Sequence, residues 1–443
     1  MSIVNYHPFF YNTLKKAINL FNKLNMNVPQ SAKKHEAGIN LSILGLCTVA
    51  FLGMTLRTKM LFNIPFINYN YLSDAHAHFA FNGWVTLGLI VLMIRHILPA
   101  EFQKKAIYWW LTGSIFFFSW VLLFTYAAEG NGHFSTIFST LLIFATYIFT
   151  WVFIRDAFKA KVNKIVLLLS VGALLSLVLS SGGAFMIAYL FSVQSLNGIL
   201  YRDALFTYLH FQYNGFFPLA IFALFLNYVN GKDISVNALQ NMRKLAISLP
   251  VTVIPTLFLS YLWHYPNIYV RSVAFVGCIC LYIFLFQLFI FLRSTWMILK
   301  QMSRYAKVLG ILTVIAVTIK IILQTGTVIP YVGIIVFGNR PIIIGYIHLV
   351  MLGFITLYLL SHLLREDLLD SNRAFTRIGI VVFSSGVIIN ELLLMSQGLT
   401  QIFMQFYPIF MWLLWGTMIW LLLGAILIFI ARIREIVQAK KQA

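Results

Sequence analysis

The chain has 443 residues, of which 60% are hydrophobic, 16% aromatic and only 10% charged, and its mean hydropathy is +0.87. Soluble domains carry about a quarter charged residues, so this composition excludes a soluble enzyme, a disordered chain and a nucleic-acid-binding domain. The net charge of +20 comes from 32 lysines and arginines against 12 acidic residues. In a membrane protein such a surplus marks cytoplasmic loops rather than affinity for polyanions.

Apolar windows of the roughly 20 residues that a helix needs to cross a bilayer recur along the chain and predict twelve transmembrane helices. We call them spans 1 to 12, and they cover residues 38–56, 72–94, 106–127, 134–154, 165–192, 204–229, 245–264, 268–292, 308–328, 341–364, 378–397 and 407–431. We therefore expect an all-α polytopic membrane protein with one transmembrane domain.

The predicted transmembrane domain covers residues 38–432, and a basic tail follows at 433–443. Before it, residues 1–37 form an N-terminal segment without the apolar core of a signal peptide. Within that segment, residues 9–24 alternate apolar and basic side chains with a helical period, which is typical of an amphipathic interfacial helix. Cys47, Cys278 and Cys280 lie in apolar runs, which argues against a disulfide framework or a cysteine-based zinc site.

The basic residues are distributed unequally between the two sides of the twelve spans. If the N-terminus is cytoplasmic, the inner segments hold 26 of the 32 lysines and arginines, the outer loops hold five, and Lys320 lies inside span 9. This split predicts a protein of the inner (cytoplasmic) membrane with both termini in the cytoplasm.

A short motif occurs on three of the spans. HFAFNG begins at His78 on span 2, HFQYNG at His210 on span 6 and HLVMLG at His348 on span 10, each a histidine followed five residues later by glycine. The motifs are 132 and 138 residues apart, so the pattern predicts three four-helix units around a pseudo-threefold axis, with the three histidines at one depth. Histidine inside the hydrocarbon usually faces a bundle interior or a ligand, and imidazole is the usual nitrogen ligand of haem and copper.

Two further histidines lie near these positions. His264 ends span 7 on the same predicted outer side, and His76 comes two residues before His78. Because two residues correspond to about 200° around a helix, His76 and His78 cannot both serve one metal, and the repeat register favours His78. Arg340, eight residues before His348, is a candidate partner for haem propionates.

Twelve helices in three arcs, with histidines on spans 2, 6, 7 and 10, resemble the catalytic subunit, subunit I, of haem–copper oxidases and nitric oxide reductases. The resemblance implies that His78 and His348 ligate a low-spin haem b and that His210 and His264 ligate a second metal, copper or non-haem iron. The LHFQYNG string around His210 is similar to the corresponding motif of the nitric oxide reductase branch.

The sequence departs from that family at two positions. The His-x-His of span 10 reads Tyr346-Ile347-His348, so tyrosine stands where the high-spin haem ligand is expected. Tyrosine can bind ferric haem, or it can be a packing residue. The family's His-His pair reads Trp263-His264, which leaves two ligands for the second metal unless His133, Tyr213, Tyr265 or water completes the site.

The resemblance implies a haem-binding membrane oxidoreductase that acts on dioxygen or nitric oxide, a small gas, with His210, His264 and Tyr346 near the reaction. The sequence has no CxxCH motif, so electrons are expected from quinol or a redox partner protein, and additional subunits are expected. One alternative is a non-respiratory role in nitric oxide tolerance or sensing, because His76-Ala77-His78 is similar to a segment of the NnrS family of haem- and copper-containing membrane proteins. Another is a twelve-helix transporter without cofactor.

Several other polar residues lie in apolar runs. Lys320 with Gln324 on span 9, and Asn390 with Glu391 on span 11, are functional candidates by default, or they form interhelical hydrogen bonds. His96 and His362 lie 18 and 14 residues beyond His78 and His348, which returns to nearly the same helix faces. These two histidines therefore either bind a second haem at the inner ends of the spans or simply lie at the membrane interface.

Overall fold

The computed structural model describes residues 30–265 and 267–442, so the predicted amphipathic segment 9–24 lies outside the described residues. Within this described part, twelve helices are long and apolar enough to cross a membrane, which confirms the predicted number of spans. They are Glu36–Leu61, Tyr69–Ile97, Ala106–Glu129, His133–Lys159, Lys164–Ser192, Gly198–Asn230, Val236–Tyr261, Ile268–Ser294, Arg304–Gly326, Arg340–Arg365, Ala374–Ile402 and Ile409–Gln438. The protein is an all-helical, multi-pass membrane protein.

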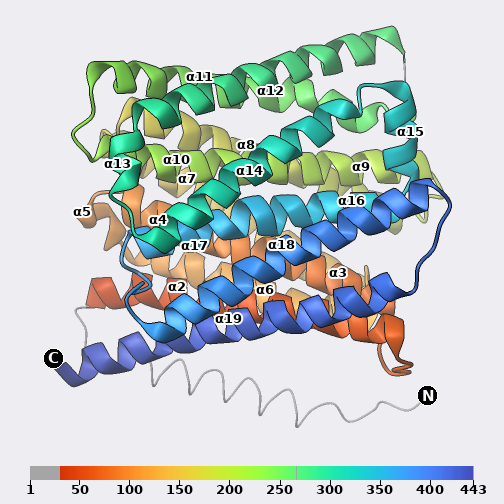
Figure 1. Cartoon of the computed structure of the whole chain (residues 1–443), viewed down its shortest axis with the longest axis horizontal. Coiled ribbons are helices and arrows are strands. Elements are labelled where there is room, and N and C mark those ends of the chain that lie inside the picture. The colour runs from red at the N-terminus through yellow and green to blue at the C-terminus, as the bar shows by residue number, and fades with distance from the viewer. Residues whose placement is uncertain (1–29, 266, 443) are drawn as a thin grey trace.

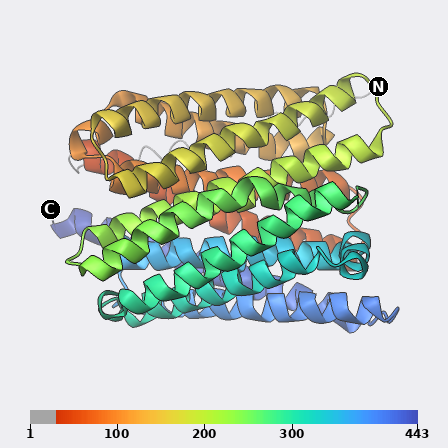
Figure 2. The ribbon, with the colours of Figure 1, turned by 90° about the horizontal axis from the view of Figure 1, so that it is seen from above.

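The helical elements follow one another with short connections, and all the spans run along one common direction (Figures 1 and 2). Spans 1 to 4 are built from α2 (Gln30–Leu61), α3 (Tyr69–Phe79), η1 (Ala80–Thr86), α4 (Leu87–Ile97), α6 (Ala106–Glu129) and α7 (His133–Lys159). Spans 5 to 8 are α8 (Lys164–Ser192), α9 (Gly198–His210), η2 (Phe211–Phe216), α10 (Phe217–Asn230), α11 (Val236–Leu257), η3 (Phe258–Tyr261) and α12 (Ile268–Ser294). Spans 9 to 12 are α14 (Arg304–Gly326), α16 (Arg340–His348), η4 (Leu349–Thr356), α17 (Leu357–Arg365), α18 (Ala374–Ile402) and α19 (Ile409–Gln442). Short helices in the connections are α5 (Ala100–Gln103), α13 (Trp296–Lys300) and α15 (Pro330–Gly338).

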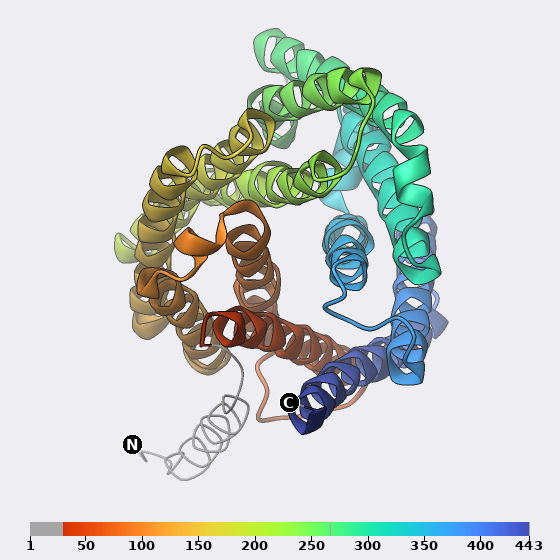
Figure 3. The ribbon, with the colours of Figure 1, turned by 90° about the vertical axis from the view of Figure 1, so that its left-hand side faces the viewer.

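Spans 2, 6 and 10 form the centre of the bundle. The apolar windows of these three spans are 78%, 83% and 61% buried, whereas those of the other spans are 39–50% buried. The end-on view shows α4, α10 and α17 enclosed by a ring of the remaining helices (Figure 3). This arrangement gives three arcs of four helices, in each of which the second helix is the inner one.

The three inner spans share a local feature that the sequence pattern did not predict. Each changes from α-helix to a π-helical segment directly after, or two residues after, its motif histidine, at η1, η2 and η4. At the end of these segments the N–H groups of Leu87, Phe217 and Leu357 donate to the carbonyls of Asn82, Gln212 and Leu352, five residues back. Such segments are rare and are frequent at functional sites, so their threefold recurrence supports the repeat independently of the sequence.

The motif glycines give the repeat a common packing role. A Cβ on Gly215 would lie 2.6 Å from Ser176 Cβ of span 5, and one on Gly353 would lie 3.3 Å from Ala316 Cβ of span 9. At Gly83 the close approach is to span 1, where a Cβ on Gly45 would meet the Gly83 carbonyl oxygen at 2.2 Å. In every arc, therefore, the first helix packs closely on the second at the motif glycine.

We call the end of the bundle where α3, α9 and α16 begin the outer end, following the orientation that the charge pattern predicts. The helices begin earlier than predicted for spans 2 and 6, so the motif histidines lie eight to twelve residues from the helix starts. At 1.5 Å per residue this corresponds to about 12–18 Å below the outer ends. The predicted span limits place the same histidines six or seven residues from the span starts, or about 10 Å deep, so the three imidazoles lie deeper than the sequence indicates.

Candidate functional site

A cavity of about 440 Å³ lies on the outer half of the bundle and receives the histidines of spans 2 and 10. We call it the histidine cavity, because His76, His78 and His348 line it together. Most of its other lining side chains are apolar, with a few polar groups that include Tyr126, Tyr208 and Gln212. A mostly apolar cavity of this size with a few convergent polar groups is typical of a cofactor or small-molecule site.

His348 is held in the orientation that a metal-ligating histidine requires. Its Nδ1 lies 2.8 Å from the Ile344 carbonyl oxygen, one helical turn back. A carbonyl can only accept, so Nδ1 carries the proton and Nε2 keeps its lone pair in the neutral ring. In metal-binding histidines, the N–H of the second ring nitrogen usually donates a hydrogen bond to a carbonyl or carboxylate in this way.

His76 and His78 point to different neighbours. His76 is an electrostatic neighbour of His348 and also faces the Val49 backbone, and its Nδ1 finds no hydrogen-bond partner in the described part of the chain. His78 instead stacks on Tyr126, with ring centroids 4.2 Å apart and an interplanar angle of 10°. The sequence register selected His78 as the partner of His348; both His76 and His78 line the cavity with His348, and His76 is the one that interacts with it electrostatically.

The arginine nearest to these histidines is not the predicted one. Arg57, on α2, interacts electrostatically with both His76 and His348. Arg340 lies at the start of α16, where its guanidinium is 5.9 Å from the centre of the Tyr69 ring. Arg57 directly follows predicted span 1 in the sequence, which gives no sign of a contact with spans 2 and 10, and only helix packing reveals it.

His210 lies in a separate hydrogen-bond network that engages both of its ring nitrogens. Its Nε2 is 2.8 Å from the Val253 carbonyl oxygen, and its Nδ1 is 3.2 Å from Nδ2 of Asn214. Asn214 Oδ1 in turn accepts from the ammonium of Lys320 at 2.5 Å. Both ring nitrogens of His210 are thus engaged with protein atoms, and a buried cation lies two hydrogen bonds away.

The same network continues to a second cavity of about 440 Å³. Lys320 Nζ donates to Gln324 Oε1 at 2.8 Å, and Tyr346 Oη donates to the same oxygen at 3.2 Å. Asn214, Gln324, Tyr346 and Glu391 all line this second cavity, which we call the tyrosine cavity. Tyr346 therefore faces away from the histidine cavity, whose lining does not include it.

His264 is paired with a carboxylate near the outer end. Its Nε2 lies 3.1 Å from Asp203 Oδ2, and the indole N–H of Trp263 donates to the other carboxylate oxygen of Asp203 at 3.1 Å. Among the described residues, the only group of three or more potential metal-ligating side chains is His96, His362 and Glu366. His210 and His264 are not brought together in such a group.

No family model matches the chain, and no curated protein matches it.

Proposed function

We propose that the protein is a membrane haem protein that holds one b-type haem in the histidine cavity and transfers single electrons. His348 would be one ligand of the haem iron, and His76 on span 2 would be the other, in place of the His78 that the sequence favoured. A bound haem would supply one-electron redox chemistry, with a potential set by its axial ligands, their hydrogen bonds and burial.

The main support for this proposal is the orientation of His348. His348 stands at the wall of a large, mostly apolar cavity with its Nδ1 proton donated to the Ile344 carbonyl and its Nε2 lone pair uncommitted. The buried Nδ1 of His76, without a hydrogen-bond partner among the described residues, supplies a second ring nitrogen in the same cavity. Burying a polar atom without a partner is costly, so this unpaired ring nitrogen fits a site built for a ligand.

The second metal that the resemblance implies does not fit the residues at His210 and His264. His210 uses one ring nitrogen on Val253 and the other on Asn214. His264 pairs with Asp203, which lies seven residues before His210 on α9. We therefore propose neither a second metal at these residues nor the reduction of dioxygen or nitric oxide.

The donor set favours a non-respiratory role over a terminal oxidase. With two protein ligands on the iron, the haem would exchange electrons with quinol or a redox partner protein, and a gas would bind only if one histidine left the iron. A role in nitric oxide tolerance or sensing, as in the NnrS family, is compatible with that chemistry.

The spectrum of the purified full-length protein tests the proposal. A dithionite-reduced sample should show the sharp α band of a six-coordinate b-type haem, and carbon monoxide should change that band little because both axial positions are filled. A protein that remains colourless after expression with a haem supply would overturn the proposal and favour a transporter without cofactor.

A further inference from the structure

We propose that His96, His362 and Glu366 form a binding site for one divalent transition metal ion, zinc or ferrous iron, at the inner end of the bundle. The site lies at the opposite ends of the same two spans that carry His76 and His348. It is separate from the proposed haem site, because none of its three residues lines either of the two cavities described above.

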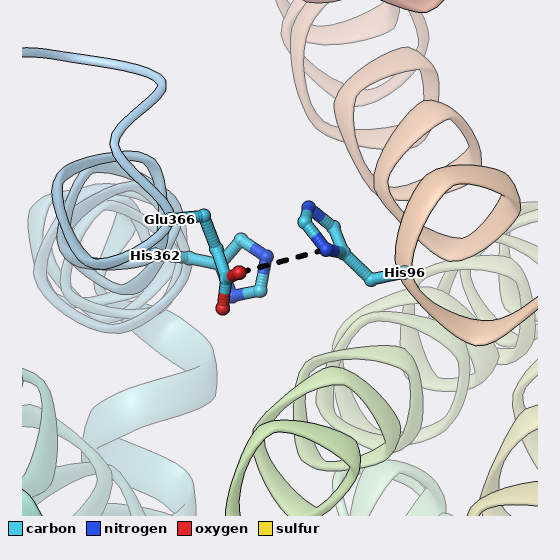
Figure 4. Close-up of side chains that lie close together, drawn as sticks. All are labelled: His96, His362 and Glu366. Atoms are coloured by element: carbon cyan, nitrogen blue, oxygen red, sulfur yellow. Dashed lines mark ion pairs between the residues drawn. The ribbon is translucent and has the colours of Figure 1, made fainter. Parts of the chain in front are cut away.

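The three side chains come from two inner helices that end at the same level. His96 is in the last turn of α4, His362 is in the last turn of α17, and Glu366 is the residue that follows α17. Figure 4 shows the two imidazoles and the carboxylate pointing into the gap between these helices. The Asn227 side chain of span 6 donates to the His96 carbonyl at 2.7 Å, so all three inner helices contribute to the placement of the cluster.

The distances are close to those of a metal site. One ligand atom from each residue lies within 4.8 Å of the others, and His96 Nδ1 is 3.7 Å from Glu366 Oε2. Ligand atoms bound at about 2.1 Å around a tetrahedral zinc lie about 3.4 Å apart, so small side-chain rotations would complete the geometry. The imidazole centroids are 5.0 Å apart and nearly perpendicular.

Burial and chemistry indicate a coordinated ion. His362 is 1% exposed, and its Nε2 has no hydrogen-bond partner among the residues described. Two imidazoles with one carboxylate leave open coordination positions and are the donor set of catalytic zinc and of non-haem ferrous sites. Calcium and magnesium prefer oxygen ligands throughout, which excludes them as the preferred ion.

Arg365 must move when the ion binds. Its guanidinium contacts Nδ1 of His362 and lies 3.5 Å from Glu366 Oε1. While Nδ1 accepts from Arg365, the proton of the neutral ring is on Nε2. Coordination through Nε2 requires that proton to be on Nδ1, and a guanidinium cannot accept it. Loading the ion is therefore coupled to the release of Arg365 from His362.

Zinc binding to the full-length protein in detergent tests the site. Protein stripped with a chelator and titrated with zinc sulfate should bind one equivalent, and cobalt should give the absorption bands of a site with nitrogen ligands. The substitutions His362→Asn and Glu366→Gln should each weaken zinc binding by more than roughly 10–100-fold, which is the typical loss when a residue that only hydrogen-bonds to a metal ligand is replaced. Arg365→Gln should strengthen it, because a competing cation is removed. His133→Asn, at the exposed start of α7, is the matched control and should bind as the wild type does. Metal content after growth with zinc or with iron then distinguishes the two ions.

Two results would overturn the inference. In the first, the wild type binds no more zinc or ferrous iron than Glu366→Gln, which replaces a half-buried side chain and should fold. In the second, His362→Asn loses haem rather than metal, which would identify a second haem between spans 2 and 10. Haem content is measured on the same samples, so failure of the metal site and failure of the proposed haem site give different results.

Discussion

Lys320 Nζ lies 2.5 Å from Asn214 Oδ1, and this contact determines the direction of every hydrogen bond from span 9 to the Val253 carbonyl. An ammonium can only donate, so Asn214 must turn its oxygen to Lys320 and its NH₂ group to His210. His210 Nδ1 then accepts, and its Nε2 carries the proton that is donated to Val253. A single buried cation thereby fixes the tautomer of the motif histidine of span 6.

Replacing Asn214 with leucine should destabilise the protein by about 2–4 kcal/mol, because the buried ammonium loses one acceptor and His210 Nδ1 loses its donor. Lys320→Met should cost less, and the double variant should be more stable than the sum of the two single effects predicts. Thermal or chemical unfolding in detergent measures these values. Independent, additive effects would show that the network does not act as a unit.

The close contact of spans 1 and 2 predicts a strong effect of a single methyl group. A Cβ on Gly45 would meet the Gly83 carbonyl oxygen at 2.2 Å, so Gly45→Ala should cost about 1–3 kcal/mol of stability through forced backbone shifts. Gly113→Ala is the matched control, since nothing lies within 4 Å of its Cβ position. It should be neutral or should stabilise the helix by up to about 1 kcal/mol. Equal unfolding midpoints for the two variants would show that the spans do not pack as closely as described.

The number and length of the spans could be predicted from the sequence, because apolar windows of about 20 residues are a direct consequence of bilayer thickness. The common motif of spans 2, 6 and 10 predicted three four-helix units, but it did not predict that these three spans form the centre of the bundle. The π-helical segments η1, η2 and η4 were not predicted. Their hydrogen bonds run to the carbonyl five residues back, and this leaves no recognisable spacing of apolar residues in the sequence. Their recurrence is visible only in the backbone.

The side-chain partners of the candidate site were harder to predict, because they depend on the rotation of each helix. His76 and His78 are only two residues apart, and a rotation of span 2 decides which imidazole faces span 10. The sequence repeat selected His78, whereas packing sets His78 on Tyr126. Arg57 and Asp203 were not predicted as partners of histidines for the same reason, since each contact joins separate spans.

Arg57 should influence the potential of the haem in the loaded protein. Removing its positive charge by Arg57→Met should favour the ferric state and lower the reduction potential by some tens of millivolts, because a positive charge beside the cavity disfavours the extra positive charge of ferric iron. Arg340→Met should shift the potential less, since Arg340 lies over Tyr69. Redox titration followed by the α band measures both values. A rise in potential for Arg57→Met would contradict the assigned position of the haem.

The predicted orientation can be tested with topology reporters in four connections. Gly231 follows α10, and Asp370 lies between α17 and α18, whereas Asn131 lies between α6 and α7, and Asn267 precedes α12. Reporters fused after Gly231 and Asp370 should report a cytoplasmic location, and reporters at Asn131 and Asn267 an external one. Reversed signals at both pairs would place the histidine cavity on the cytoplasmic half of the membrane.

The haem content of the wild type and of His348→Ala, measured side by side as pyridine haemochrome per chain, tests the central claim most directly. The wild type should hold one haem b, and His348→Ala should lose the six-coordinate low-spin haem because one of its two axial imidazoles is gone. His76→Ala should behave like His348→Ala, and His78→Ala should keep its haem, because His78 stacks on Tyr126. A wild type without haem, or a His348→Ala variant with an unchanged spectrum, would contradict the account.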